Sequence, residues 1–206
     1  MSMKQKINQY LNTLSPLDRS HSIRVSIYAR NFGKVLGFND HELKILSNTA
    51  IMHDIGKSQI SRKILEKKGK LNTLEFEQIK THPAKSEEIL LSIPGLKDYA
   101  YITRHHHERW DGTGYPDRLK EQDIPLYSRI ISIVDVYDAL TSKRPYREKV
   151  FTPKEALKIL VDGMESQFDP EMLKIFIRNS NEILGLYHKC SQLKSVVNIT
   201  KQQKII

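Results

Sequence analysis

The segment from Ser128 to Ser142 constrains the fold most, because it has the length and spacing of a helix that is apolar on nearly every side. A helix of that kind is buried inside its protein. Asp135 stands in the middle of the segment, between Val134 and Val136. A carboxylate in such surroundings is rarely left without a partner. The segment therefore predicts a buried helix with a cationic partner beside Asp135.

Helical periodicity dominates the rest of the chain and strand-like alternation is nearly absent, so we predict an all-α fold. The expected helices run over Ser2–Leu14, from Asp18 or Ser20 to Gly37, from Asn39 or Asp40 to Gly56, from Thr73 through Leu90 with a kink or break at Pro83, over Leu96–Arg109, and from the two cap-and-proline pairs Thr152-Pro153 and Asp169-Pro170 onward. Beyond Leu186 the sequence turns polar, and we expect a loosely held C-terminal tail.

A chain of 206 residues with 39% hydrophobic and 28% charged residues is expected to form one soluble globular domain. We divide it into an N-terminal helix (1–14), a main domain (15–180) and a polar basic tail (181–206). The chain has no apolar run long enough for a membrane span, no hydrophobic signal core and a single cysteine, Cys190, which together predict a cytoplasmic location.

The formal net charge of +9 favours an anionic partner, or serves only solubility. No aromatic residues are interleaved with the basic runs, so a nucleic-acid surface is not specifically indicated.

Two segments carry the residues expected to do chemistry. His106-His107-Glu108 is followed by the loop Gly112-Thr113-Gly114-Tyr115-Pro116, whose glycines let the backbone approach a substrate. His53-Asp54 closes an apolar helical run just before Gly56-Lys57. Because adjacent helical residues lie about 100° apart, both side chains of the pair can point into one pocket. Together the segments predict a multinuclear metal site that hydrolyses a phosphate ester.

Seven residues are candidate metal ligands: His21, His53, Asp54, His82, His106, His107 and Asp135. His21 and His82 are weak signals alone, and spacing does not decide which two of the run His105-His106-His107 coordinate. Two six-coordinate ions offer about twelve positions. Seven ligands, one of them bridging, supply about eight and a bridging hydroxide two more, which leaves roughly two for phosphate oxygens. This suits hydrolysis by metal-activated water. Imidazole and carboxylate ligands without thiolate favour iron or manganese.

Several further residues are expected around the metals. Asp138 follows Asp135 by about one turn and either orients an imidazole, which we favour, or pairs with Arg144. Lys57, Arg144 and Arg147 are candidates to bind an anionic substrate, because the planar arginine side chain suits phosphate or a guanine edge. The alternative for each of these basic residues is plain solvent exposure.

At these residues the sequence resembles the HD-GYP family, a branch of the HD-domain metal-dependent phosphohydrolases. The matching motifs, spread over about Leu14 to Arg178, are His21-x-x-Arg24, His53-Asp54-Ile55-Gly56-Lys57, His82-Pro83, His106-His107-Glu108, Gly112-Thr113-Gly114-Tyr115-Pro116, Asp135 to Thr141 and Arg144-Pro145-Tyr146-Arg147. The resemblance implies an HD-domain helical bundle and a bimetallic or trimetallic centre. It also implies hydrolysis of cyclic di-GMP through pGpG towards GMP.

The resemblance further implies a role for each matching residue. The seven candidates would be the metal ligands, with Asp54 bridging and His105 supernumerary. Lys57 would contact the scissile phosphate and protonate the leaving oxygen, and Arg144 and Arg147 would grip the phosphate or the guanine. Tyr115 would line the pocket, in a loop (Gly112–Pro116) that the family links to diguanylate cyclase (GGDEF) domains. A homodimer is a further expectation.

One departure from the family pattern affects the number of metals. Trimetallic members carry a glutamate four residues before the first motif histidine, where this chain has Leu17. Asp18 is adjacent but lies about 100° around the helix. We therefore predict two metal ions.

Two alternative functions stay open. The first is a phosphohydrolase for another nucleotide, such as cyclic GMP-AMP or a mononucleotide; the Gly112–Pro116 loop argues against a mononucleotide. The second is a non-catalytic module that binds a cyclic dinucleotide or docks a cyclase, and the complete set of seven candidate ligands argues against it.

Overall fold

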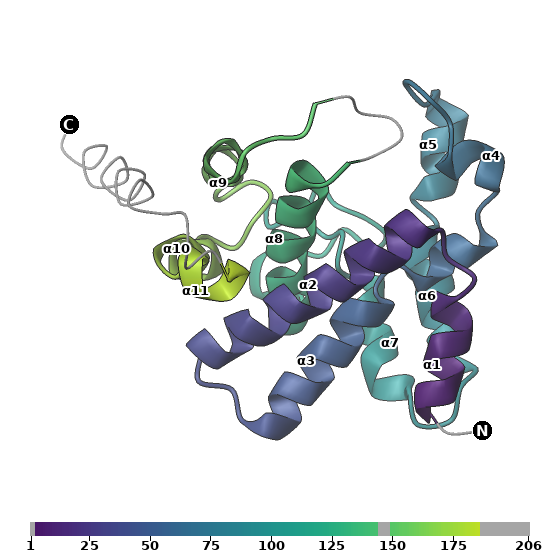
Figure 1. The fold of residues 1–206 in the computed structure, drawn as a ribbon, viewed down its shortest axis with the longest axis horizontal. Coiled ribbons are helices and arrows are strands. Elements are labelled where there is room, and N and C mark those ends of the chain that lie inside the picture. The colour runs from purple at the N-terminus through teal and green to yellow at the C-terminus, as the bar shows by residue number, and fades with distance from the viewer. Residues whose placement is uncertain (1–2, 144–148, 186–206) are drawn as a thin grey trace.

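The computed structural model describes residues 3–143 and 149–185, and within these ranges it is helical, with a single isolated β-bridge between Met164 and Phe168. The prediction of an all-α fold is confirmed (Figure 1). The elements are α1 (Met3–Leu11), α2 (Pro16–Val35), α3 (Asp40–Met52), η1 (Ile55–Gln59), α4 (Arg62–Leu65), α5 (Thr73–Ile79), α6 (His82–Leu91), α7 (Lys97–Arg104), η2 (Glu121–Asp123), α8 (Leu126–Thr141), α9 (Pro153–Asp162), α10 (Pro170–Arg178) and α11 (Ser180–Leu184). None of the described helices combines the length and apolarity needed to cross a bilayer.

Helix α2 begins earlier than the sequence predicted. Its N-cap is Ser15, whose side-chain oxygen accepts a hydrogen bond from the backbone N–H of Asp18 at 3.1 Å. Pro16 occupies the first turn, where its missing N–H costs no hydrogen bond. The expected start at Asp18 or Ser20 is therefore wrong, whereas Asn39 caps α3 as predicted.

The long helix expected from Thr73 is two helices. Asn72, rather than Thr73, caps α5 and accepts from the backbone N–H of Glu75 at 2.9 Å. Helix α6 then starts afresh at His82, with Pro83 in its first turn. A proline cannot donate the hydrogen bond that would continue the preceding helix, so the expected break falls just before it. The break places His82 at the start of a helix.

The remaining helices differ from the prediction mainly at their ends. Helix α7 ends at Arg104 instead of Arg109, and residues 105–107 form a turn. Thr152 and Asp169 cap α9 and α10 as predicted, each followed by its proline.

The packed part of the chain extends past residue 180, which we expected to be the end of the main domain. Helix α11 buries Ile183 and Leu184 in the core, with 0% and 7% of their surface exposed. The expected loose tail beyond Leu186, with Cys190, lies outside the described residues.

Two hydrophobic cores meet in the middle of the molecule. The larger core joins α2, α3 and α8 to α9–α11, around Phe32 and Phe176. The smaller core joins α1, the end of α3, η1, α6 and α7, around Met52 and Leu90. Figure 1 shows α2 and α3 as an antiparallel pair, with α6, α7 and α1 towards one end of the molecule and α9–α11 towards the other. Residues at the end of α3 therefore lie where the two cores adjoin.

Gly56 holds η1 tightly against α6. Its backbone N–H donates to Oγ of Ser86 at 2.8 Å, and that hydroxyl donates to the carbonyl of His53 at 3.0 Å. A β-carbon on Gly56 would lie 2.6 Å from the backbone nitrogen of Ser86 and collide with the carbonyl oxygen of His82. Only glycine fits this approach.

We predict that Gly56→Ala lowers Tm by roughly 2–10 °C, because overpacking costs about 1–3 kcal/mol in a domain of this size. Thermal unfolding followed by circular dichroism measures the change. Gly69→Ala is the comparison: its φ of +91° adds some backbone strain, but no atom lies within 4 Å of the new methyl group. A Tm for Gly56→Ala equal to that of the unaltered chain would contradict the packing described here.

Candidate metal centre

The structure brings the seven predicted ligand residues together at the junction of the two cores. Six of them are buried and His107 is partly buried. They come from α2, the end of α3, the start of α6, the turn after α7, and α8: His21, His53, Asp54, His82, His106, His107 and Asp135.

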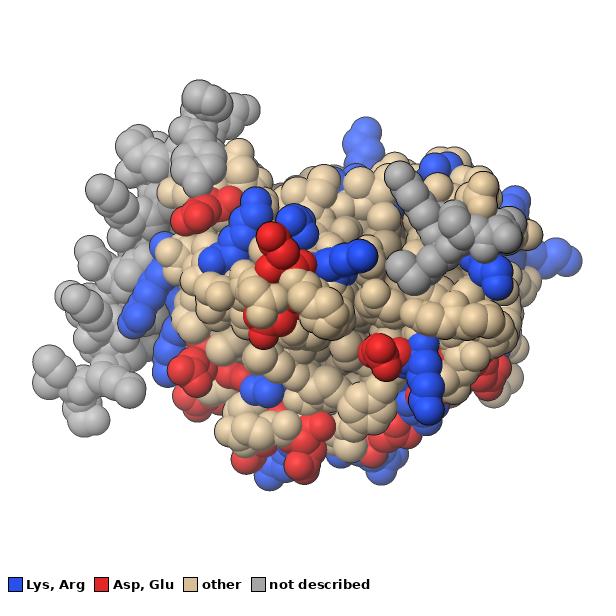
Figure 2. Space-filling view, turned by 90° about the horizontal axis from the view of Figure 1, so that it is seen from below, with Lys and Arg blue, Asp and Glu red and all other residues tan. Residues whose placement is uncertain are grey.

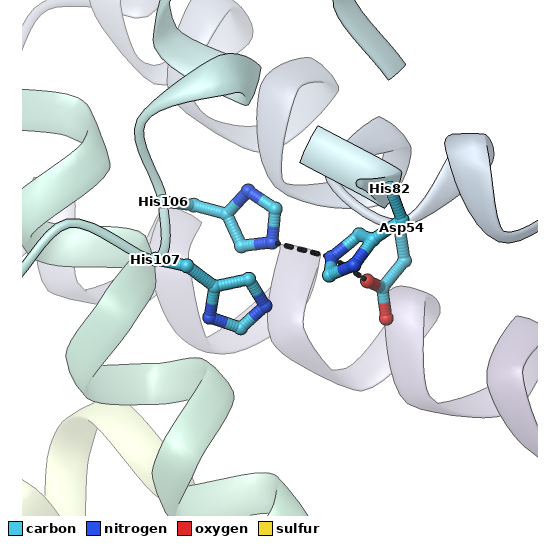
Figure 3. Close-up of side chains that lie close together, drawn as sticks. All are labelled: Asp54, His82, His106 and His107. Carbon is cyan, nitrogen blue, oxygen red and sulfur yellow. Dashed lines mark hydrogen bonds and ion pairs between the residues drawn. The ribbon is translucent and has the colours of Figure 1, made fainter. Parts of the chain in front are cut away.

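The first group of ligand atoms belongs to Asp54, His82, His106 and His107, which lie within 4.8 Å of one another. Figure 3 shows His106 and His107 side by side, facing His82 and Asp54. Nε2 of His82 lies 3.1 Å from Oδ1 of Asp54 and 3.3 Å from Nε2 of His106.

The second group consists of His21, His53 and Asp54, and it shares Asp54 with the first. Nε2 of His21 and Nε2 of His53 lie 3.7 Å and 3.3 Å from Oδ2 of Asp54. Asp135 joins from α8, with Oδ1 2.9 Å from Nε2 of His21 and 3.7 Å from Nε2 of His53. Two adjoining groups with one carboxylate in common suit a pair of cations.

Backbone carbonyls fix the orientation of three of the imidazoles. Nδ1 of His53, His82 and His106 donates to the carbonyl of the residue three positions earlier, at 2.7, 2.7 and 2.6 Å. A carbonyl oxygen only accepts, so each Nδ1 carries a proton, and the Nε2 atom that remains for a metal faces the centre. Such hydrogen bonds orient metal-binding histidines in other proteins.

Asp138 plays the corresponding part for His21. Its Oδ2 lies 2.7 Å from Nδ1 of His21, and Arg24 donates to the same carboxylate at 2.6 and 2.9 Å. This is the orienting role that we favoured from the sequence. The alternative partner, Arg144, lies outside the described residues, as does Arg147.

Several buried atoms fit a cation at the centre. The Nε2 atoms of His82 and His106 face each other at 3.3 Å, although both present lone pairs when the rings are neutral. Nε2 of His53 and Oδ1 of Asp54 are buried and make no hydrogen bond to any described residue. Buried polar atoms without partners are costly, and a cation bound in each of the two groups would satisfy all of them.

The histidines nearest the loop are held neutral, as metal binding requires. Burial, and then the neighbouring imidazoles, keep the pKa of His106 well below its usual value. Burial and His82 lower the pKa of His107 to about 3. Both rings therefore keep a free lone pair at neutral pH.

The carboxylates are held ionised. Burial alone would raise the pKa of Asp54, but His53 and Lys57 outweigh it and lower that pKa well below its usual value. His21 and His53 do the same for Asp135. Burial disfavours a charge on His53, yet the two carboxylates raise its pKa to about 10. Even without metal, the site draws in positive charge.

Two predicted substrate contacts lie beside the centre. Nζ of Lys57, on η1, lies 2.6 Å from Oδ2 of Asp54, and its side chain is 16% exposed. The ring of Tyr115 stacks on His107 at 5.0 Å between centroids. Burial raises the pKa of Tyr115, so its phenol stays neutral.

A network that the sequence did not reveal anchors the Gly112–Pro116 loop. Arg104 donates to both oxygens of Asp117 at 2.6 and 2.7 Å, and Nε2 of His105 lies 2.8 Å from the same carboxylate. Glu108 accepts from the backbone N–H of Asp117 at 2.7 Å. His105 therefore points away from the centre, towards the carboxylate of Asp117 that also pairs with Arg104. The only sequence signal was the placement of His105 beside the motif.

The loop also depends on a close backbone approach at Gly114. A β-carbon there would lie 2.6 Å from the α-carbon of Glu108 and 2.7 Å from the carbonyl of His107. The next residue, Tyr115, donates from its backbone N–H to that carbonyl at 3.3 Å. The glycine thus places Tyr115 over His107.

Leu17, the position of the missing glutamate, is 49% exposed and offers no ligand atom.

The chain is similar to known proteins over most of its length. The HD domain family model matches residues 2–172. The chain is 38% identical to the 3'3'-cGAMP-specific phosphodiesterase 3 of Vibrio cholerae, over 76% of this chain and 34% of that protein. It is 37% identical to the cyclic di-GMP phosphodiesterase response regulator RpfG of Xanthomonas campestris, over 78% and 43%. The chain spans less than half the length of these curated relatives.

Solved structures share the fold at low identity. Bd1817, an HDG"Y"P protein from Bdellovibrio bacteriovorus, superposes with a TM-score of 0.63 at 18% identity, covering 83% of this chain and 52% of that one. The HD domain of the Listeria monocytogenes phosphodiesterase PgpH gives 0.57 at 21% identity, covering 87% and 99%. From the family-model match and the shared helical bundle, the chain belongs to the HD-domain family, and its motifs resemble those of the HD-GYP group within it.

Proposed function

We propose that this chain is a metal-dependent phosphodiesterase that hydrolyses cyclic di-GMP through pGpG towards GMP. The observation that carries the proposal is the sharing of Asp54 by two buried groups of ligand atoms, with Nε2 lone pairs turned inward. When bound, two divalent cations would activate a water molecule and offset the charge that develops on the phosphate. Imidazole and carboxylate ligands favour iron or manganese.

The protein's own groups divide the remaining tasks. Asp54 bridges the two groups and stays ionised because His53 and Lys57 lower its pKa. Lys57 holds a positive charge at the edge of the centre, where it donates to a phosphate oxygen and then gives a proton to the leaving oxygen. The Asp138–His21 contact fixes one imidazole against Asp135.

The substrate class follows from charge and from the named relatives. Relatives are named as phosphodiesterases of cyclic di-GMP and of 3'3'-cGAMP, which makes cyclic GMP-AMP the second candidate. On the face drawn in Figure 2, Lys and Arg are interspersed with Asp and Glu, which does not favour a long nucleic acid. A small anion that enters the centre fits this distribution better.

Several finer assignments complete the proposal. Tyr115 lines the substrate pocket, Arg144 and Arg147 grip the substrate, and the Gly112–Pro116 loop contacts GGDEF domains. A cytoplasmic location and a homodimer remain predictions from the sequence.

We predict that metal stabilises the protein. At a free Mn²⁺ concentration 100 times Kd, binding adds about 2.7 kcal/mol of stability, which corresponds to a rise in Tm of roughly 5–10 °C. Thermal unfolding of protein treated with EDTA, with and without added Mn²⁺, measures this rise.

Asp54→Ala should abolish both the rise in Tm and the hydrolysis of cyclic di-GMP, because both groups lose a ligand. Asp98→Ala, which removes an exposed carboxylate from the first turn of α7, is the matched control and should keep both. Normal turnover by Asp54→Ala would rule out the bridging role.

Lys57→Gln is predicted to lower kcat by about 100-fold or more, the usual contribution of a general acid, while the metal content stays unchanged. Steady-state kinetics and elemental analysis of the same samples distinguish a loss of turnover from a loss of metal. Lys63→Gln, an exposed lysine on α4, serves as the control. Loss of metal from Lys57→Gln would assign Lys57 to the structure of the site instead.

Substrate choice is tested by chromatography of the products. Protein purified without oxygen, with iron and manganese quantified, is incubated with cyclic di-GMP and with cyclic GMP-AMP. We expect cyclic di-GMP to yield pGpG and then GMP. Tight binding of either dinucleotide without any metal-dependent product would support the non-catalytic alternative.

A further inference from the structure

A second hollow adjoins the metal centre on the side of η1. This cavity, of about 770 Å³, lies between the start of α2, η1 and the α4–α5 hairpin. Figure 1 shows α4 and α5 projecting beyond the N-terminal end of α2. The volume of the cavity falls within the range of roughly 300–1,000 Å³ that is usual for small-molecule sites.

Two residues connect this cavity directly to the centre. Lys57 lines the cavity, and its Nζ lies 2.6 Å from Oδ2 of Asp54. Ile79 also lines it, and its carbonyl accepts the hydrogen bond from Nδ1 of His82. If a phosphate is bound at the centre, the group attached to that phosphate can therefore enter this cavity.

The walls of the cavity suit a flat aromatic group with a polar edge. Aliphatic side chains such as Leu14, Ile60 and Ile64 line it, together with the ring of Phe76, which is 49% exposed. Arg62 and other basic residues stand along the same lining. A purine has apolar faces that stack on aromatic rings and an edge rich in hydrogen-bond acceptors.

Lys80 lies between this cavity and the Gly112–Pro116 loop. Its Nζ lies 5.8 Å from the centroid of the Phe76 ring and 5.6 Å from that of Tyr115. Lys80 and Tyr115 both line a second cavity of about 510 Å³ at the Gly112–Pro116 loop. Each of the two cavities is therefore lined by an aromatic residue, Phe76 in one and Tyr115 in the other. This number matches the two bases of a dinucleotide.

We propose that the 770 Å³ cavity holds one purine base of the cyclic dinucleotide, stacked on Phe76, while the phosphate attached to that nucleoside lies at the metal centre. The proposal rests on the function proposed above and adds a specificity-determining site to it. Phe76 contacts the base and takes no part in bond cleavage.

The test compares two substrates in Mn²⁺-loaded protein. Stacking on an aromatic ring contributes about 1–3 kcal/mol per base, so Phe76→Ala should lower kcat/KM for cyclic di-GMP by roughly 5- to 150-fold. Cleavage of methyl p-nitrophenyl phosphate, which has a phosphodiester but no purine, should change less than two-fold. Phe76→Tyr keeps the ring and should restore near-normal values.

Leu74→Ala is the matched control, because Leu74 lies on the same helix, is 77% exposed and does not line the cavity. An unchanged kcat/KM for cyclic di-GMP in Phe76→Ala, or an equal fall for both substrates, would overturn the base site alone. Cleavage of the small ester without any cleavage of a cyclic dinucleotide by the unaltered chain would overturn the proposed function, and the base site with it.

Discussion

The structure of the centre depends on three hydrogen bonds from ligand imidazoles to the ends of helices. Helices leave their last carbonyls without partners inside the helix, and Nδ1 of His53, His82 and His106 binds such carbonyls at the ends of α3, α5 and α7. One contact thereby satisfies a helix end, selects the tautomer and aims Nε2 inward. The negative ends of the three helix dipoles also lie near the centre, where they favour cations.

The position of the centre between two cores follows from the same helix ends. Ala50 packs in the larger core, whereas Met52 and Ile55, on either side of His53-Asp54, pack in the smaller one. The buried pair therefore lies where neither core can supply a fully apolar surrounding. Unpaired buried charges are expensive, so cations bound between the two cores would stabilise both.

The surroundings of the centre divide into a rigid side and an open side. On the rigid side, Gly114 and the Arg104–Asp117 ion pair hold Tyr115 in place over His107. On the open side, Lys57 stands between the centre and the 770 Å³ cavity. A cavity therefore lies on each flank of the centre, one beside Lys57 and one at the Gly112–Pro116 loop.

The sequence by itself determined the helical class, most cap positions and the set of histidines and carboxylates from which the centre is built, because helical periodicity and residue type are local properties. The carboxylate of Asp135 inside an apolar run already required a cation. Only the tertiary structure decided which histidines converge: His105 is identical in type to its neighbours, yet it turns towards Asp117. Tertiary contacts also decided that two ligand groups share Asp54 and that a cavity forms beside Phe76. Both features depend on contacts between segments that are far apart in the sequence.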